Sequence, residues 1–457
     1  MSRLLAYFQL DARRTTVATE VRAGITTFLV MAYVMFVNPQ YVSSANPALA
    51  HAGAPGPVAI AAASALAAGI LTIAMGLVTN YPFAMASGMG LNAVVAYDLI
   101  ATKGLSWSEA MAVIVWEGLI ITLLVVTGLR QAIIDAIPMV LKRAIAVGIG
   151  LFMLMIGLYE GGVIVKSPAS GVAMTLGFGT TPHAVLAVFG VGLLLALVFL
   201  QRKTPGGLLL AILGATGVAL LTGVTTLPAQ FVSPFDPAQF SGVGQAFGAM
   251  GSVWSSGTGP LAVALAIFTI MLSDFFDTAG TIVGLGARAG MLDERGRLPH
   301  AGRVLLVDSL GAGLGGVLGV SSVTTYIESA GGIEEGGRTG LTSVVTGLLF
   351  LLVIVAAPIA GMIPAAATAP ALVVIGTLMF QTMRDVEWSD LSDGFPILAT
   401  LMLMPLTYSI TNGVGGGFLT YGILKLAAGK GREVSPLLWV VNAAFTVYFA
   451  MKLGLIG

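Results

Sequence analysis

Apolar blocks long enough to cross a membrane recur from Gly24 to the C-terminus, and they constrain the fold more than any other feature of the sequence. A helix needs about 20 mostly apolar residues to span a bilayer. The 457 residues are 57% hydrophobic and 9% charged, whereas a soluble domain carries about 25% charged residues. The sequence therefore predicts an all-α polytopic membrane protein.

The composition also excludes several kinds of chemistry. The chain has no cysteine, so disulfides, cysteine-ligated metals and thiol catalysis are excluded. Its net charge is zero, which gives no indication of a nucleic-acid partner. The three histidines, His51, His183 and His300, fall in predicted loops and offer no convincing metal ligand or base. We therefore expect no cofactor and no metal site.

The basic residues set the predicted orientation in the membrane. Four arginines precede the first apolar block: Arg3, Arg13, Arg14 and Arg22. Further Lys and Arg clusters fall in alternate loops, whereas the long segment 225–260 contains none. Because basic loops stay on the cytoplasmic side, the pattern predicts a cytoplasmic N-terminus and about 14 spans in the cell (inner or plasma) membrane. The last apolar piece, residues 436–457, is either a further span or a helix in the membrane interface.

Two of the apolar segments are interrupted. One is NYPFAMASGMGLNAVVAYDLI, which begins at Asn80 and is broken by Pro82, Gly88 and Gly90; the other is GVSSVTTYIESAGGIEEGG, residues 319–337. In the second, Val-Thr-Thr-Tyr-Ile favours extended backbone and the glycines discourage a continuous helix. Interrupted segments at matching places in two halves are typical of transporters built from inverted repeats, which bind substrate at the breaks. The alternative is that the glycines merely permit close helix packing.

Three acids lie in predicted intramembrane segments: Asp274, Asp277 and Glu328. A carboxylate at the bilayer centre costs about 2.5–3.5 kcal/mol on insertion scales, so such a residue is a candidate functional group. Asp274 and Asp277 are three residues apart and therefore share a helix face. With no obvious intramembrane Lys or Arg to neutralise them, these acids suit proton uptake and release, or acceptance of hydrogen bonds from a neutral ligand rich in N–H groups. Alternatively, one aspartate caps a helix break or bonds Ser273 or Thr278.

Other polar residues of the apolar segments are weaker candidates. Asn92 offers a donor and an acceptor, and it either lines the same cavity or bonds a neighbouring helix. Glu117 and Asp308 lie inside predicted spans, where they face the cavity or bond neighbouring helices. A charged group after the second break is predicted to form a helix start or a gating cluster at the cytoplasmic mouth: Glu334, Glu335 and Arg338.

Four motifs together carry a family resemblance: GITTFLVMAYVMFVNP at Gly24, PFAMASGMGLNA at Pro82, SDFFDTAGTIVG at Ser273 and TTYIESAGGIEEGGRTGLTSVV at Thr324. They resemble the adenine/guanine/hypoxanthine permeases. This is the AzgA-like branch of the nucleobase–cation (nucleobase–ascorbate) symporter superfamily. The similarity covers nearly the whole chain, from about Leu4 to Arg432.

The resemblance implies a 7+7 inverted repeat of transmembrane segments. Residues 1–128 and 259–362 would form a substrate-holding core domain from segments 1–4 and 8–11. Residues 129–258 and 363–457 would form a gate domain from segments 5–7 and 12–14. Segments 3 and 10 would begin as short antiparallel half-strands and continue as half-helices. The resemblance also implies a homodimer that is formed through the gate domains.

The same resemblance implies roles for individual residues. Glu328 would stand at the substrate site, at the end of a Thr-Thr-Tyr-x-Glu run of the superfamily, and Asp277 matches the coupling position of segment 8. Asn92 matches a polar residue of segment 3, and the backbone of Phe83 and Ala84 would face the ligand. The predicted substrate-binding set is Glu328, Asp277, Asn92, Phe83, Ala84, Tyr326, Ile327 and Thr325, and the predicted proton-coupling set is Asp277, Asp274 and Glu328. The branch commonly has an apolar residue in place of Ser273, so the preferred purine stays open.

Together with the intramembrane acids, the resemblance implies a transporter rather than an enzyme: a proton-coupled importer of hypoxanthine, adenine or guanine in which the core domain would move against the gate domain. Sodium is the alternative coupling ion. A transporter of the same architecture for another nucleobase or a small anion is the main rival, although Asp277 and Glu328 would repel an anion. A channel would need a continuous polar pore lining. An intramembrane aspartyl protease would need a Gly-x-Gly-Asp context, whereas Asp274 follows Met-Leu-Ser.

Overall fold

The computed structural model describes residues 7–49, 51–129, 137–167, 174–234, 236–293, 297–380 and 390–455. Arg3, one of the arginines used to predict the orientation, lies outside these ranges. Within them, eight helical stretches are long and apolar enough to cross a membrane: Val17–Val42, Pro57–Thr79, Trp107–Val126, Met139–Glu160, His183–Gln201, Pro260–Arg288, Ala301–Leu318 and Gly340–Met362. The chain is thus a multi-pass helical membrane protein, as the sequence predicts.

Several shorter helices accompany these spans. The apolar ones are Met89–Thr102, Gly207–Leu221, Ala365–Met379, Leu391–Leu406 and Pro436–Lys452. The helix α18 (Ile410–Ala427) packs against both α17 (Leu391–Leu406) and α19 (Pro436–Lys452). The last apolar piece of the sequence is therefore a helix, α19. The total of about 14 spans, and whether α19 is one of them, stay predictions.

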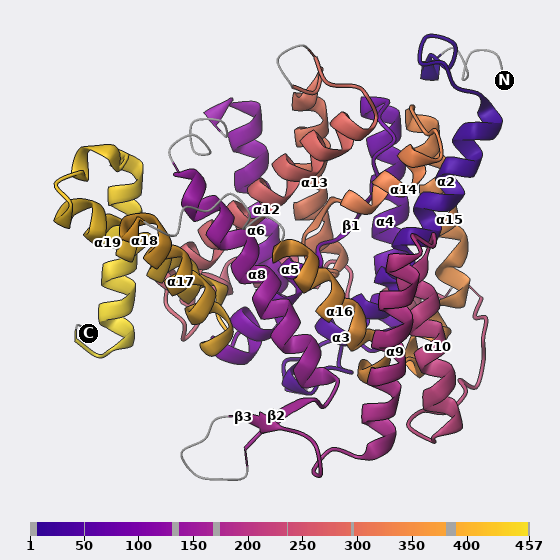
Figure 1. Cartoon of the computed structure of the whole chain (residues 1–457), viewed down its shortest axis with the longest axis horizontal. Helices are drawn as coiled ribbons and strands as arrows, with labels where there is room; N and C mark the ends of the chain where they lie inside the picture. Colours follow the sequence, from indigo (N-terminus) through magenta and orange to yellow (C-terminus); the bar gives the residue numbers. More distant parts are fainter. Residues whose placement is uncertain are drawn as a thin grey trace.

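The helices form two flanks around a central group. The elements used below are α2 (Val17–Met31), α3 (Val34–Val42), α4 (Pro57–Thr79), α5 (Met89–Ala93), the π-helix η2 (Val94–Thr102), α6 (Trp107–Val126), α8 (Met139–Glu160), α9 (His183–Gln201), α10 (Gly207–Leu221), α12 (Pro260–Arg288), α13 (Ala301–Leu318), α14 (Ala330–Glu334), α15 (Gly340–Leu352), the 3₁₀ helix η6 (Val353–Met362) and α16 (Ala365–Met379). Figure 1 shows α17–α19 on one flank and α2, α4 and α15 on the other, with β1 and α5 between them. The hairpin of β2 (Ile164–Lys166) and β3 (Met174–Leu176) lies at the end opposite the N-terminal segment (Figure 1).

Two short strands meet in the buried interior. Strand β1 (Met85–Ser87) pairs antiparallel with β4 (Val323–Thr325), and Ala86 lies opposite Thr324. Each strand follows a helix that ends in the left-handed region: α4 at Asn80, with φ 55°, and α13 at Gly319, with φ 75°. The predicted pair of antiparallel half-strands is thus confirmed. The 7+7 repeat and the core and gate domains stay predictions.

Neighbouring helices fix the point at which β1 begins. The Thr72 hydroxyl of α4 accepts a bond from the Met85 N–H (2.9 Å) and donates to the Met85 carbonyl (3.1 Å). The Ser343 hydroxyl of α15 donates to the Phe83 carbonyl (2.8 Å). Backbone groups at membrane depth need such partners, since lipid supplies none. These bonds hold the residues before Met85 outside the strand.

The charged residues after the second break form the start of α15 and two surface ion pairs. Glu20 of α2 is fully buried and accepts bonds from the Arg338 N–H (2.9 Å) and from the Thr342 hydroxyl (2.6 Å), so it satisfies N–H and hydroxyl groups at the start of α15. Glu335 pairs with Arg22 (3.0 Å) and Glu334 with Arg288 (2.8 Å), at exposed positions. Of the two alternatives predicted for these charged residues, a helix start or a gating cluster, the helix start applies to Arg338, whose backbone N–H bonds Glu20. The sequence had not singled out Glu20.

Backbone contact between two helices brings α4 and α15 together. Gly76 and Gly340 face each other so closely that a Cβ on either would collide with the carbonyl of the other. Small residues allow such close approach in membranes, where helices gain packing rather than hydrophobic burial. This contact sets the spacing between the two helices that hold β1.

Gly340→Ala is expected to destabilise the protein by about 1–3 kcal/mol, because the added methyl group overpacks the contact with Gly76. Gly217→Ala, in α10, is the matched control, because nothing lies within 4 Å of its Cβ position. The control should change stability by no more than about 1 kcal/mol, in the stabilising direction. Thermal unfolding of both variants in detergent measures the difference, and equal melting temperatures would contradict the packing argument.

Candidate functional site

A cavity of about 420 Å³ lies where the two interrupted segments meet α8, α12 and α16. Its lining combines α2–α3 at Tyr33, the start of α5, the middle of α8, the middle of α12, the end of β4 with the residues that follow it, and the last turns of α16. The lining residues are Tyr33, Gly88, Met89, Gly90, Leu91, Ile145, Ala146, Ile149, Met153, Ser273, Phe276, Asp277, Gly280, Thr281, Thr325, Tyr326, Ile327, Glu328, Ile375 and Met379. Most of this wall is apolar, with a few polar groups gathered on one side, as is usual for small-molecule sites.

Five of the predicted site residues line this cavity. They are Asp277 on α12 and the run Thr325, Tyr326, Ile327 and Glu328 at the end of β4. Asp277 is open to the cavity, and Glu328 is half-buried in its wall. The structure thus brings together the two acids to which the sequence gave the leading roles. No lysine or arginine is among the described lining residues, so the acids face the cavity without a cation beside them in its wall.

Phe83 and Ala84 are buried behind the cavity and are not among its described lining residues. The Ala84 N–H donates to the Ser329 hydroxyl (2.9 Å) and the Ala84 carbonyl accepts from the Tyr326 N–H (2.9 Å). The Phe83 carbonyl accepts from Ser343. These three polar groups therefore fix the break itself, and that this backbone faces the ligand stays a prediction.

Asn92 and Asp274 are also buried away from the described cavity wall. The Asn92 side-chain oxygen accepts from the Ser87 hydroxyl (2.7 Å), so it ties the start of α5 back to β1. Asp274 shares a helix face with Asp277 on α12, yet it lies among packed neighbours, whereas Asp277 reaches the cavity. Three residues along a helix are a rotation of about 60° short of a full turn, and here that difference separates the two side chains.

Asp308 of α13 holds strand β4 in place. It is fully buried, and it accepts bonds from the Thr325 N–H (2.8 Å), the Thr325 hydroxyl (2.8 Å) and the Thr278 hydroxyl of α12 (2.7 Å). Of the two alternatives for this residue, the bond to neighbouring elements is the one observed. Glu117 of α6 is likewise buried, close to Asp308 and Ser322.

Tyr33 is a site residue that the sequence analysis missed. It lies at the junction of α2 and α3, lines the cavity, and donates a hydrogen bond of 2.8 Å from its hydroxyl to Oε1 of Glu328. Its partner is 295 positions away in the chain, so no local pattern indicates the contact. One feature of the sequence indicated that Tyr33 belongs to the site: it lies inside the motif GITTFLVMAYVMFVNP.

The first residues of α5 line the same cavity. Gly88, Met89, Gly90 and Leu91 all line it, and no side chain caps this helix. The first N–H groups of a helix have no partner within the helix and carry partial positive charge. The cavity therefore places acceptors, the carboxylates of Asp277 and Glu328, near a set of backbone donors.

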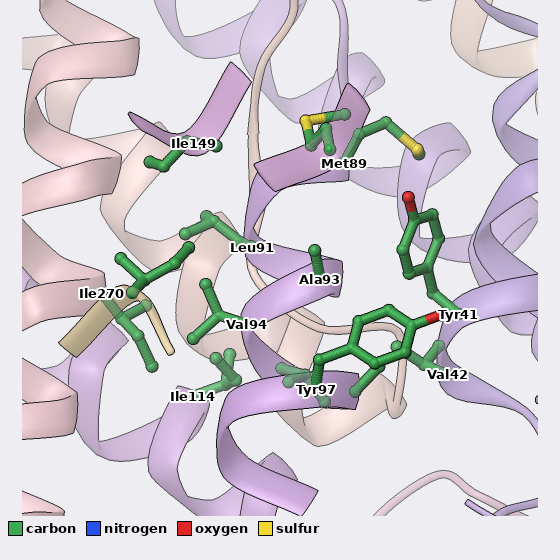
Figure 2. Packing of buried hydrophobic residues seen from close by; sticks show 14 of the residues in the cluster. Tyr41, Val42, Met89, Leu91, Ala93, Val94, Tyr97, Ile114, Ile149 and Ile270 are labelled. Atoms are coloured by element: carbon green, nitrogen blue, oxygen red, sulfur yellow. The ribbon is translucent and has the colours of Figure 1, made fainter. Parts of the chain in front are cut away.

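Contacts between α8 and η2 lie on the side of the cavity away from the N-terminal segment. The Tyr97 hydroxyl of η2 donates to Oε1 of Glu160, the last residue of α8 (2.7 Å). The Tyr97 ring packs edge-on against Tyr41 and Phe152, with centroids 6.2 and 6.4 Å away. Figure 2 shows Tyr41 and Tyr97 together at one end of this packed group, and Met89 and Ile149, which line the cavity, at the other.

A buried ion pair adds to these contacts. Lys103 and Asp98 are paired at the end of η2, where both side chains are almost fully buried. The second oxygen of Asp98 accepts from the Thr411 hydroxyl at the start of α18 (2.9 Å). We call Tyr97, Asp98, Lys103, Glu160 and Thr411 the closing cluster, because these residues join α8 and α18 to η2 beyond the end of the cavity.

Comparisons with known proteins agree with this arrangement. The Xan_ur_permease model, described as a permease family, matches residues 18–415. Adenine permease AdeP of Escherichia coli is 38% identical over 96% of this chain and 94% of that protein. Guanine/hypoxanthine permease PbuG of Bacillus subtilis is 36% identical over 97% of this chain and 98% of that protein.

Solved structures of more distant proteins share the fold. The transmembrane domain of the cyanobacterial bicarbonate transporter BicA matches with a TM-score of 0.61 and 16% identity, over 86% of this chain and 97% of that one. The murine anion transporter Slc26a9 in its inward-facing state also matches with a TM-score of 0.61, at 12% identity, over 90% of this chain and 68% of that one. At such low identity the likeness concerns the fold alone.

The fold, the central cavity and these relatives define a membrane transporter, not an enzyme. The chain belongs to the permease family, in the branch that contains the adenine and guanine/hypoxanthine permeases. The resemblance stated from the four sequence motifs is thereby confirmed.

Proposed function

We propose that this chain imports purine nucleobases across the cell membrane, coupled to protons, and that it binds them in the cavity beside Glu328. The observation that carries the proposal is the meeting of a carboxylate and uncapped helix N–H groups in one largely apolar cavity. Relatives named as adenine and guanine/hypoxanthine permeases along their whole length support the substrate class.

The chemistry of the cavity matches that of a purine. A purine nucleobase is planar and neutral, with N–H donors and ring acceptors along its edge. Glu328 would accept from ring N–H groups, and the N–H groups at the start of α5 would bond the ring acceptors. Apolar side chains such as Leu91, Ile149 and Phe276 would cover the faces of the ring. A small anion fits this site less well, because Asp277 and Glu328 would repel it.

Asp277 is the proposed proton carrier. It faces the cavity without a lysine or arginine among the described lining residues, and it lies near both Glu328 and Asp308. Proton binding there would remove a negative charge from the cavity wall, and proton release on the other side of the membrane would restore it. Asp274, the other predicted candidate on α12, lies away from the cavity and is the weaker carrier.

The position of the cavity supports alternating access. Its lining on α8 comes from the middle of the helix, and on α16 from the last turns. The closing cluster includes Glu160, at the end of α8 that leads into the β2–β3 hairpin. With the predicted cytoplasmic N-terminus, contacts at this end would close the cavity toward the outside. The cluster joins the predicted core domain, at Tyr97 and Asp98, to the predicted gate domain, at Glu160 and Thr411.

Uptake into proteoliposomes under an imposed pH gradient tests the function. Labelled hypoxanthine would be competed with adenine, guanine, xanthine, uracil, sulfate and bicarbonate, in the presence and absence of a sodium gradient. Saturable, pH-driven uptake blocked by purines alone is the expected result. Dependence on sodium would replace the proton as coupling ion, and uptake of another solute unaffected by purines would overturn the substrate assignment.

Glu328→Gln is expected to weaken purine binding at least 10-fold, because the amide places a donor where the ligand needs an acceptor. Equilibrium binding of labelled hypoxanthine to the purified protein measures this change. An affinity equal to that of the wild type would remove Glu328 from the site.

Asp277→Asn is expected to abolish pH-driven accumulation, since the amide cannot carry a proton. Counterflow exchange of purine across the same vesicles, which needs no proton gradient, should persist and shows that the variant is folded. Undiminished accumulation would assign the proton to another group.

Tyr97→Phe is expected to shift the protein toward the outward-open state by about 10-fold, because it removes the hydrogen bond to the Glu160 carboxylate. The natural absence of cysteine allows Ile149→Cys in the cavity wall to report access to a membrane-impermeant thiol reagent from each side. Tyr421→Phe, at a buried tyrosine of α18 outside the cavity lining, is the control. Unchanged labelling from the outside in the Tyr97 variant would show that the cluster does not hold the closed state.

A further inference from the structure

The backbone fixes Tyr33 at the middle of its span. Helices α2 and α3 form one apolar stretch, Val17–Val42, and Tyr33 lies at the tight turn between them. The Met35 N–H bonds the Ala32 carbonyl and the Phe36 N–H bonds the Tyr33 carbonyl, both three residues back. Tyr33 is 1% exposed, so packing fixes the orientation of its ring and therefore the position of its hydroxyl oxygen.

Glycines hold Glu328 opposite that hydroxyl. Directly after Glu328, α14 lies on α2, and Gly331 and Gly332 allow the contact. A Cβ at Gly332 would lie 2.6 Å from the Ala23 carbonyl oxygen, and one at Gly331 would lie 3.1 Å from the Val30 side chain. The distance of 2.8 Å from the Tyr33 hydroxyl to Glu328 therefore follows from two packed backbones.

Three other hydroxyls in the cavity wall have different partners. The Tyr326 hydroxyl donates to the Ser87 carbonyl, the Thr325 hydroxyl to Asp308, and the Ser273 hydroxyl to the Thr269 carbonyl. Across the cavity, Asp277 is a second carboxyl group rather than a fixed donor. Among the described residues, Tyr33 is thus the side chain whose hydrogen bond orients the Glu328 carboxylate.

We propose that Tyr33 is a positioning residue for the substrate carboxylate: its hydroxyl holds one oxygen of Glu328, so that the other oxygen is presented to a ligand N–H. This inference rests on the proposed purine binding at Glu328. A carboxylate oxygen held in advance loses less rotational freedom when the ligand binds. The bond also occupies the sole proton of the Tyr33 hydroxyl, which leaves that oxygen able to accept from the ligand as well.

The test is the binding and transport of labelled hypoxanthine by Tyr33→Phe in the full-length protein. Phenylalanine keeps the ring and its packing, so the fold should be preserved. We expect the dissociation constant and KM for hypoxanthine to rise about 10-fold, with the maximal rate of uptake within about two-fold of the wild-type value. Tyr421→Phe, which also removes a buried tyrosine hydroxyl but lies away from the cavity lining, should bind like the wild type.

A double-mutant cycle separates positioning from a general loss of stability. Melting temperatures of the ligand-free wild type, Tyr33→Phe, Glu328→Met (which removes both acceptor oxygens) and the double variant can be compared even if a variant binds no purine. Direct coupling requires that the double variant lose less stability than the sum of the two single variants. Additive losses would overturn the proposal, as would wild-type affinity in Tyr33→Phe. Absence of purine binding by the wild type would instead overturn the proposed function on which this inference rests.

Discussion

The pairing of β1 with β4 is the constraint on which the rest of the structure depends. Extended backbone inside a membrane protein survives only where protein groups satisfy its N–H and C=O groups. Here the strands satisfy each other, and Asp308, Thr72, Ser329 and Ser343 bond the groups that remain at their edges. Buried polar side chains on four different elements therefore serve one purpose, which is to keep two helix breaks facing each other.

The breaks in turn create the cavity. Each strand ends where a short helix starts, so the chain delivers the uncapped N-terminus of α5 and the side chain of Glu328 to the same space. Helix α12 closes the cavity with Asp277, and α8 and α16 contribute the apolar side. Helix α8 meets the strand side of the cavity through polar contacts, such as Tyr97 with Glu160, and through aromatic packing, such as Tyr97 against Phe152.

The sequence predicted the parts of this site that depend on local chemistry. Val323–Thr325 is β-branched throughout and lies between glycine-rich stretches, so its extended form was evident, and the acids at Asp277 and Glu328 were conspicuous in apolar surroundings. What it missed depends on contacts between distant segments. The start of β1 depends on Thr72 and Ser343, so the sequence did not reveal that Phe83 and Ala84 are buried outside the described cavity lining. The proposed role of Tyr33 depends on the packing of α14 against α2, and the residue spacing within either segment does not reveal that contact.

The most direct test of the account is a structure determined by electron cryomicroscopy with hypoxanthine bound at saturation. The account predicts a flat ring in the cavity, with an N–H group about 2.7–3.2 Å from a Glu328 oxygen and ring acceptors toward the N–H groups at the start of α5. A purine bound elsewhere on the protein, or in the cavity but turned away from Glu328, would contradict it.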